Sequence, residues 1–269
     1  MTVHTLIPEA DTYGVAILVI YGLGSSSLAV HIHSRWLAGR RTNFWTVRNL
    51  IQAFTVVWGL LLFAPGQILG NSLTAWSLSI PAGAVAGWAA GRAEQTIIRR
   101  SSRWQLILTS QSGPKGGSTV RRTGDPRSRR VRPAPILTAG VAKKRAIGMR
   151  KGWESFHLSP AELQFGFWSI MMASVLEELV YRGFLVQACF LLDDRFLMVM
   201  ALVGTLLVFA LSHIQFGWLQ VLAKFPLGAL ALMTVLSFET VLPAIVAHII
   251  FNFGVWKKLK EEPNVYQTV

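Results

Sequence analysis

Three long stretches of this chain contain no Asp, Glu, Lys or Arg: residues 12–34, 49–91 and 196–223. A transmembrane helix needs about 20 predominantly apolar residues, so the 43-residue stretch has room for two. Its middle, residues 65–71, is rich in the Gly, Pro and Asn that are typical of a turn. Only 14% of the 269 residues are charged, against roughly 25% in a soluble domain. The sequence therefore predicts an all-α, polytopic transmembrane helical bundle.

The positive charge is concentrated in one segment. Residues 97–151 hold 15 Lys and Arg and one acid, Asp125, in a chain of net charge +13. Loops rich in Lys and Arg stay on the cytoplasmic side of a membrane. No nucleic-acid-binding motif accompanies the charge, so no nucleic acid partner is expected. We expect residues 109–135 to be disordered and residues 136–153 to lie on anionic lipid headgroups, as a topology anchor rather than a specific binding site.

The distribution of charges predicts about seven spans, with six or eight as alternatives. The N-terminus is then outside, and the basic loop and the C-terminus are cytoplasmic. Arg35, Arg40, Arg41 and Arg48 fall in the cytoplasmic loop between the first two spans. The predicted spans are residues 13–33, 49–67, 72–91, 163–190, 196–213, 217–236 and 240–256.

The fourth span carries Glu177, Glu178 and Arg182, the only charges between residues 163 and 192. Ionisable groups at that depth cost a few kcal/mol each, so we expect them to have a use. Glu178 and Arg182 are four residues apart, on one helical face, and should form a mainly structural pair. Glu177 lies about 100° away with no local partner, which favours a proton-transferring role for it.

Two later spans carry single histidines in apolar surroundings. Phe209 and His213 are four residues apart on the fifth span, and His248 and Asn252 are four apart on the seventh. A lone polar residue in a transmembrane helix often only holds helices together. Groups suited to catalysis on three separate spans instead favour one shared site.

These three motifs, Glu-Glu-x-x-x-Arg, Phe-x-x-x-His and His-x-x-x-Asn, occur in this order on successive helices. Together they resemble the CPBP intramembrane endopeptidases, also called the ABI or CAAX-protease family, over about residues 145–256. The resemblance implies that Glu177 and His213 activate a water molecule. It also implies that His248 and Asn252 stabilise the oxyanion, while Glu178 and Arg182 support them. Phe209 would pack on His213.

Two versions of the chemistry remain open. Glu177, His213 and His248 are a legitimate zinc set with an open fourth position. In a metal-free version, Glu177 and His213 deprotonate the water while His248 and Asn252 donate to the oxyanion. The carboxamide of Asn252 favours the metal-free version, because it is a better oxyanion donor than a typical ligand. The sequence lacks His-Glu-x-x-His and Gly-x-Ser-x-Gly, which argues against a site-2-type zinc protease and a rhomboid-type serine nucleophile.

We therefore interpret the chain as an intramembrane endopeptidase of a prokaryotic plasma membrane, acting on a membrane-associated or lipidated peptide or protein. Its predicted parts are a three-span unit, a basic insertion, a catalytic helical core and a cytoplasmic tail, at residues 1–96, 97–152, 153–256 and 257–269. Two alternatives are a non-enzymatic scaffold and a proton-coupled transporter. The transporter is disfavoured because no polar counterpart of the Glu177 helix occurs among the first three spans.

Overall fold

The computed structural model describes residues 12–37, 44–70, 72–111 and 166–261. Within these ranges the chain is helical and forms no strand. Most of the basic insertion, with its predicted disordered and lipid-contacting segments, lies outside the described residues. The predicted insertion nevertheless begins as helix, because residues 92–111 contain neither Gly nor Pro and continue the preceding helix.

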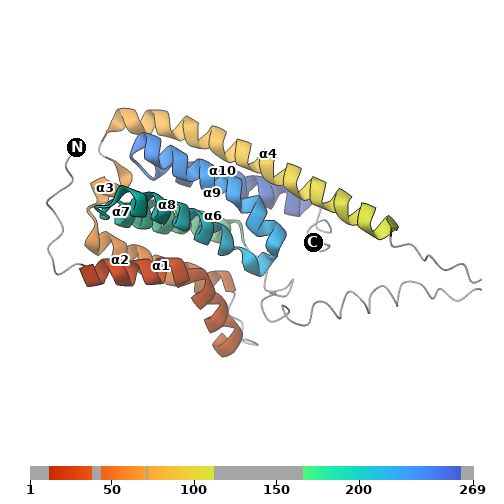
Figure 1. Cartoon of the computed structure of the whole chain (residues 1–269), viewed down its shortest axis with the longest axis horizontal. Helices are drawn as coiled ribbons and strands as arrows, with labels where there is room; N and C mark the ends of the chain where they lie inside the picture. Colours follow the sequence, from red (N-terminus) through yellow and green to blue (C-terminus); the bar gives the residue numbers. More distant parts are fainter. Residues whose placement is uncertain (1–11, 38–43, 71, 112–165, 262–269) are drawn as a thin grey trace, which may run out of the picture. The chain divides into compact units, whose positions relative to one another are not determined.

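Figure 1 shows the order of the helices along the chain. The N-terminal elements are α1 (Thr12–Ile32), η2 (His33–Leu37), α2 (Phe44–Leu62), α3 (Pro65–Leu69) and α4 (Leu73–Gln111). The C-terminal elements are α6 (Phe167–Glu178), η4 (Leu179–Phe184), α7 (Leu185–Phe190), α8 (Arg195–Leu211), η5 (Ile214–Phe216), α9 (Trp218–Phe238) and α10 (Leu242–Glu261). Because α6, η4 and α7 follow one another without a break, they form one rod with a π-helical turn inside it.

The predicted all-α membrane bundle is confirmed. Three helices of the described chain are long and apolar enough to cross a membrane: Tyr13–Leu37, Phe44–Leu62 and Trp218–Phe238. A shorter apolar helix covers Arg195–Leu211. Each predicted span coincides with a helix or helical rod, while the number of seven crossings stays a prediction.

The predicted turn at residues 65–71 contains the short helix α3. Pro65 occupies its first turn, where a missing N–H costs nothing. The Ala64 N–H donates to the side-chain oxygen of Gln67 at 3.2 Å, which caps the helix. Gly70, with φ of 72°, ends it.

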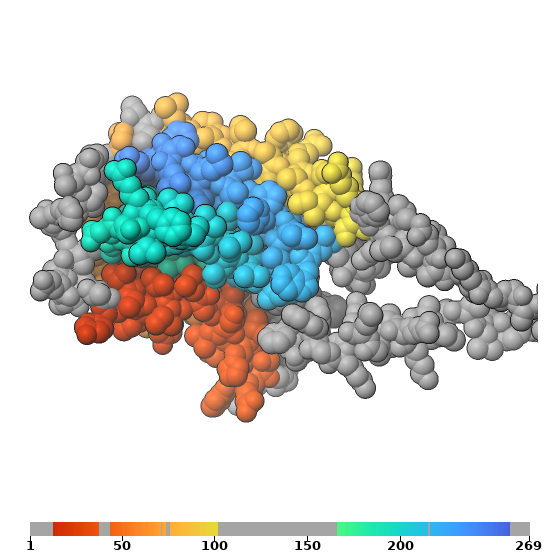
Figure 2. Space-filling view, viewed as in Figure 1, coloured from red at the N-terminus to blue at the C-terminus, as the bar shows by residue number. Residues whose placement is uncertain are grey.

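The rod of α6, η4 and α7 is the central element of the unit formed by residues 1–99 and 158–269. Its first part packs against α2 and α10, its π-turn against α2, α3, α8 and α9, and α7 against α1 and α8. Tyr181 and Phe184 in the rod, with Phe209 and Leu227 from α8 and α9, are completely buried. The space-filling view shows α1 and α8 side by side on one face (Figure 2). The charged residues of α6 and η4 therefore lie inside the bundle.

Two glycines of α4 permit a close approach to α10, which runs beside α4 in Figure 1. A Cβ atom at Gly83 would clash with the carbonyl oxygen of Pro243, and one at Gly87 with that of Ala247. Small residues spaced by four let helix backbones pack tightly in a membrane. Gly91, one turn further on, has open space at its Cβ position.

We predict that Gly87→Ala lowers the free energy of unfolding by about 1–3 kcal/mol, because the added methyl group pushes α4 away from the α10 backbone. The measurement is thermal unfolding of the purified protein in detergent. Gly91→Ala is the matched control and should leave the melting temperature unchanged or raise it slightly. Equal melting temperatures for the two variants would contradict the close packing of α4 on α10.

Candidate active site

The Glu177 carboxylate is held by an arginine from a distant part of the chain. Arg48 Nη2 on α2 lies 2.9 Å from Glu177 Oε1, and both side chains are buried. The same nitrogen donates to the hydroxyl of Ser26 on α1 at 3.3 Å. The prediction that Arg48 belongs to the loop before the second span is wrong, because α2 begins at Phe44 and includes it. Glu177 therefore has an ion-pair partner that is distant in sequence, whereas the spacing within its own helix correctly predicted no local one among the described residues.

The pattern of α2 contains a sequence signal that Arg48 faces the interior of the bundle, although it does not identify the partner. Arg48, Gln52 and Thr55 follow at intervals of four and three residues, which places them on one helical face. All three are buried in the structure. A polar stripe inside an otherwise apolar helix indicates a face turned toward other polar groups rather than toward lipid.

His213 lies opposite the second oxygen of the same carboxylate. The distance from Glu177 Oε2 to His213 Nε2 is 3.8 Å, too long for a direct hydrogen bond. On the other side of the ring, His213 Nδ1 is 3.0 Å from the carbonyl oxygen of Phe209 and 3.2 Å from the Ser212 hydroxyl, which itself donates to that carbonyl at 2.8 Å. A carbonyl can only accept, and the hydroxyl proton is directed at it, so we assign the proton of the neutral ring to Nδ1. His213 Nε2 then carries a lone pair, so two hydrogen-bond acceptors, His213 Nε2 and Glu177 Oε2, face each other.

Glu178 points to a different set of partners. Its Oε2 lies 3.4 Å from Arg182 Nη1, so the predicted pair is present. Its Oε1 lies 2.7 Å from His248 Nδ1 on α10. Arg182 also donates to the carbonyl oxygen of Gly228 on α9 at 3.1 Å. Glu178 and Arg182 therefore join α6 and η4 to the two last helices.

His248 and Asn252 project together from α10, as their spacing predicts, and both face α6. Asn252 Nδ2 donates to the hydroxyl of Ser174 at 2.8 Å, and His248 contacts Glu178. Ser174 and Glu178 are themselves four residues apart, so two polar contacts connect the antiparallel helices in matching register. Ser174 is not among the predicted site residues, although its spacing of four residues from Glu178 places both side chains on one helical face.

The ring of Phe209 contacts three of the polar side chains described above, those of His213, His248 and Arg182. Its centroid is 5.3 Å from that of His213 and 5.9 Å from that of His248, both edge-on. The guanidinium carbon of Arg182 lies 3.8 Å from the same centroid, a favourable cation–π distance. Phe209, which is completely buried, thereby brings both histidines against one ring.

The side chains that the sequence offers as zinc ligands do not fit a three-ligand site. His248 is hydrogen-bonded to Glu178 through Nδ1, and Glu177 is paired with Arg48 through Oε1, so only Nε2 of His248 and Oε2 of Glu177 remain to face a ligand. Among the residues that the structure describes, no three His, Cys, Asp or Glu side chains are grouped so that they could hold a metal ion. Each carboxylate instead has an arginine partner.

A further buried ion pair, in addition to those of Arg48 with Glu177 and Arg182 with Glu178, joins Lys224 and Glu94. Lys224 Nζ on α9 is 3.8 Å from Glu94 Oε1 on α4, and 3.9 Å from the ring centroid of Phe251 on α10. Lys224 is a charged residue inside the sixth predicted span, residues 217–236. The Glu94 carboxylate and the Phe251 ring compensate its burial, which explains how α9 tolerates it.

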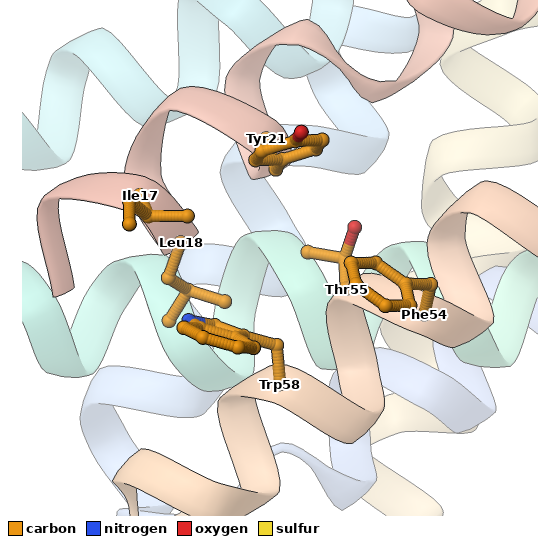
Figure 3. Close-up of a pocket in the computed structure, with 6 residues that line it drawn as sticks. All are labelled: Ile17, Leu18, Tyr21, Phe54, Thr55 and Trp58. Atoms are coloured by element: carbon orange, nitrogen blue, oxygen red, sulfur yellow. The ribbon is translucent and has the colours of Figure 1, made fainter. Parts of the chain in front are cut away.

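Two cavities of the bundle are lined by other residues. A cavity of about 200 Å³ between α1 and α2 is lined by Ile17, Leu18, Tyr21, Phe54, Thr55 and Trp58 (Figure 3). A larger one, about 790 Å³, lies between α1, α7 and α8 and is lined mainly by apolar side chains. Neither includes Glu177, His213, His248 or Asn252. Of these four, Asn252 is the least buried.

Comparison with known families gives one match. Residues 159–254 match the family model described as "Rce1-like: Type II CAAX prenyl endopeptidase Rce1-like", which confirms the resemblance to the CAAX-protease family. No curated protein and no solved structure matches the chain significantly. With the apolar helices, the match identifies an integral membrane protein.

We predict that Arg182→Ala destabilises the protein by about 3–5 kcal/mol, because it leaves the buried Glu178 carboxylate without its cation. Thermal unfolding in detergent measures the loss. Arg195→Ala, at an exposed arginine in the first turn of α8, is the control. If both variants melt at the temperature of the wild type, Glu178 and Arg182 do not support the fold.

Proposed function

We propose a specific reaction for this chain, because residues 159–254 match the Rce1-like CAAX endopeptidase family model, which supports an intramembrane endopeptidase in general terms. It hydrolyses a peptide bond of a membrane-associated or lipidated peptide or protein, using water activated by Glu177 and His213. The single observation that supports this most is the pair of acceptors, Glu177 Oε2 and His213 Nε2, 3.8 Å apart inside the bundle.

A water molecule is the natural partner for two such acceptors. Water has two protons to donate, one toward each acceptor, and its remaining lone pairs are then free to attack a carbonyl carbon. As the C–O bond forms, one proton passes to the base, and the carbonyl π electrons move to the oxygen. Collapse of this intermediate breaks the C–N bond, and the protonated base returns the proton to the leaving amine.

The oxyanion would be stabilised from α10. Because His248 Nδ1 is bonded to Glu178, only Nε2 is left for a substrate, and it donates only when the ring is doubly protonated. The Asn252 carboxamide has two N–H groups, of which one donates to Ser174 and the second remains for the oxyanion.

Nothing in this mechanism passes through a metal. Two observations support that choice: no three His, Cys, Asp or Glu side chains are grouped as ligands among the described residues, and Arg48 already pairs with Glu177. The substrate is proposed only as a class, a peptide bond close to the membrane.

We predict that Glu177→Gln and His213→Ala each lower kcat by about 10²- to 10⁴-fold, because each removes one of the two acceptors that hold the water. The measurement is cleavage of internally quenched peptides, with and without a lipid anchor, by the protein purified in detergent. Glu239→Gln makes the same chemical change at an exposed position after α9 and should retain full activity.

Wild-type activity in either Glu177→Gln or His213→Ala rules out this mechanism. Loss of activity on treatment with a strong zinc chelator would contradict the metal-free version alone. A protein that cleaves no peptide, and whose Glu177→Gln variant has no biological phenotype, would favour the non-enzymatic scaffold instead.

A further inference from the structure

Arg48 is one of the most completely buried charges of the described chain. It has no solvent exposure, although its helix is apolar enough to cross a membrane. A guanidinium cannot lose its proton in a protein, so its charge persists inside the bundle. Burying it costs several kcal/mol unless it is paired and hydrogen-bonded. Glu177 provides the pair, and Ser26 accepts a hydrogen bond from it.

The contact uses one oxygen of the carboxylate and leaves the other in the site. Arg48 Nη2 lies 2.9 Å from Oε1 of Glu177, whereas Oε2 has no hydrogen-bond partner among the residues that the structure describes. Oε2 is the atom 3.8 Å from His213 Nε2. The arginine therefore fixes the rotation of the carboxylate so that its second oxygen stays directed at the histidine.

Helix α2 is itself held against the rod at two points that follow Arg48 in the chain. The next residue, Asn49, donates to the backbone oxygen of Ser169 on α6 at 3.2 Å. Three turns further along, Gly59 approaches the rod so closely that a Cβ atom would lie 2.6 Å from the ring of Phe184. The position of Arg48 relative to Glu177 is thus set by helix packing as well as by the ion pair.

We propose that Arg48 is a positioning residue for the reaction, which holds the Glu177 carboxylate turned toward His213. This inference rests on the proposed function. It extends the active machinery beyond residues 159–254, because α2 lies outside the segment that matches the family model. Catalytic geometry needs placement within about 0.5 Å, and a contact that fixes one oxygen supplies it.

The test compares Arg48→Gln and Arg48→Lys in the peptide cleavage assay on the full-length protein. Arg48→Gln should lower kcat about 100-fold with little change in KM, because the carboxylate is misplaced while substrate contacts persist. Arg48→Lys keeps the charge and should recover part of kcat. Arg92→Gln is the control. Arg48 lies 5.3 Å from the ring centroid of Trp45, and Arg92 lies at the same distance from that of Trp88 but is exposed on α4. The Arg92→Gln variant should behave as the wild type.

Several results would overturn the proposal. Wild-type kcat in Arg48→Gln shows that Glu177 needs no anchor, and a rise in KM with unchanged kcat makes Arg48 a substrate contact. If Arg48→Gln does not fold, Arg48→Lys decides: a folded variant with normal kcat in which only the melting temperature falls assigns Arg48 a structural role alone. Full activity in Glu177→Gln would instead refute the proposed function, whatever Arg48 does.

Discussion

The arrangement of this bundle depends on matching each buried carboxylate with a cation. Glu177 and Glu178 are neighbours in sequence, and two adjacent negative charges inside apolar helices would be strongly unfavourable alone. Arg48 and Arg182 approach them from opposite directions, one from α2 and one from η4. These two pairs determine which helices must surround the rod. They also determine which carboxylate oxygens remain for chemistry.

The two glutamates have different surroundings and therefore suit different tasks. Glu178 Oε1 accepts hydrogen bonds from His248 Nδ1 and Arg182 Nη1, and its Oε2 lies 3.4 Å from the same arginine nitrogen, so Glu178 connects helices. Glu177 is paired with Arg48 through Oε1, and its Oε2 faces His213 Nε2, where the proposed reaction places the water molecule. A π-helical turn starts directly after Glu178 and contains Arg182, and such turns are frequent at functional sites.

The helical class and most helix positions could be predicted from the charge-free stretches, because lipid admits few other backbone structures. The pair of Glu178 and Arg182 could be predicted from spacing within one helix. The partner of Glu177 could not, because Arg48 is 129 residues away and contacts across helices have no sequence period. A positive charge next to an apolar stretch is equally typical of a cytoplasmic loop. Because α2 begins five residues before the predicted span, Arg48 lies inside the helix instead of in the loop.

The shared ring of Phe209 has a consequence for how the histidines respond to change. Both imidazoles lie edge-on to one buried aromatic ring, which also packs against the Arg182 guanidinium. Neighbours with a common contact do not contribute independent free energies. A substitution at either histidine changes the packing that the other shares, so we expect the effects of substituting His213 and His248 to be non-additive although the two residues lie on different segments.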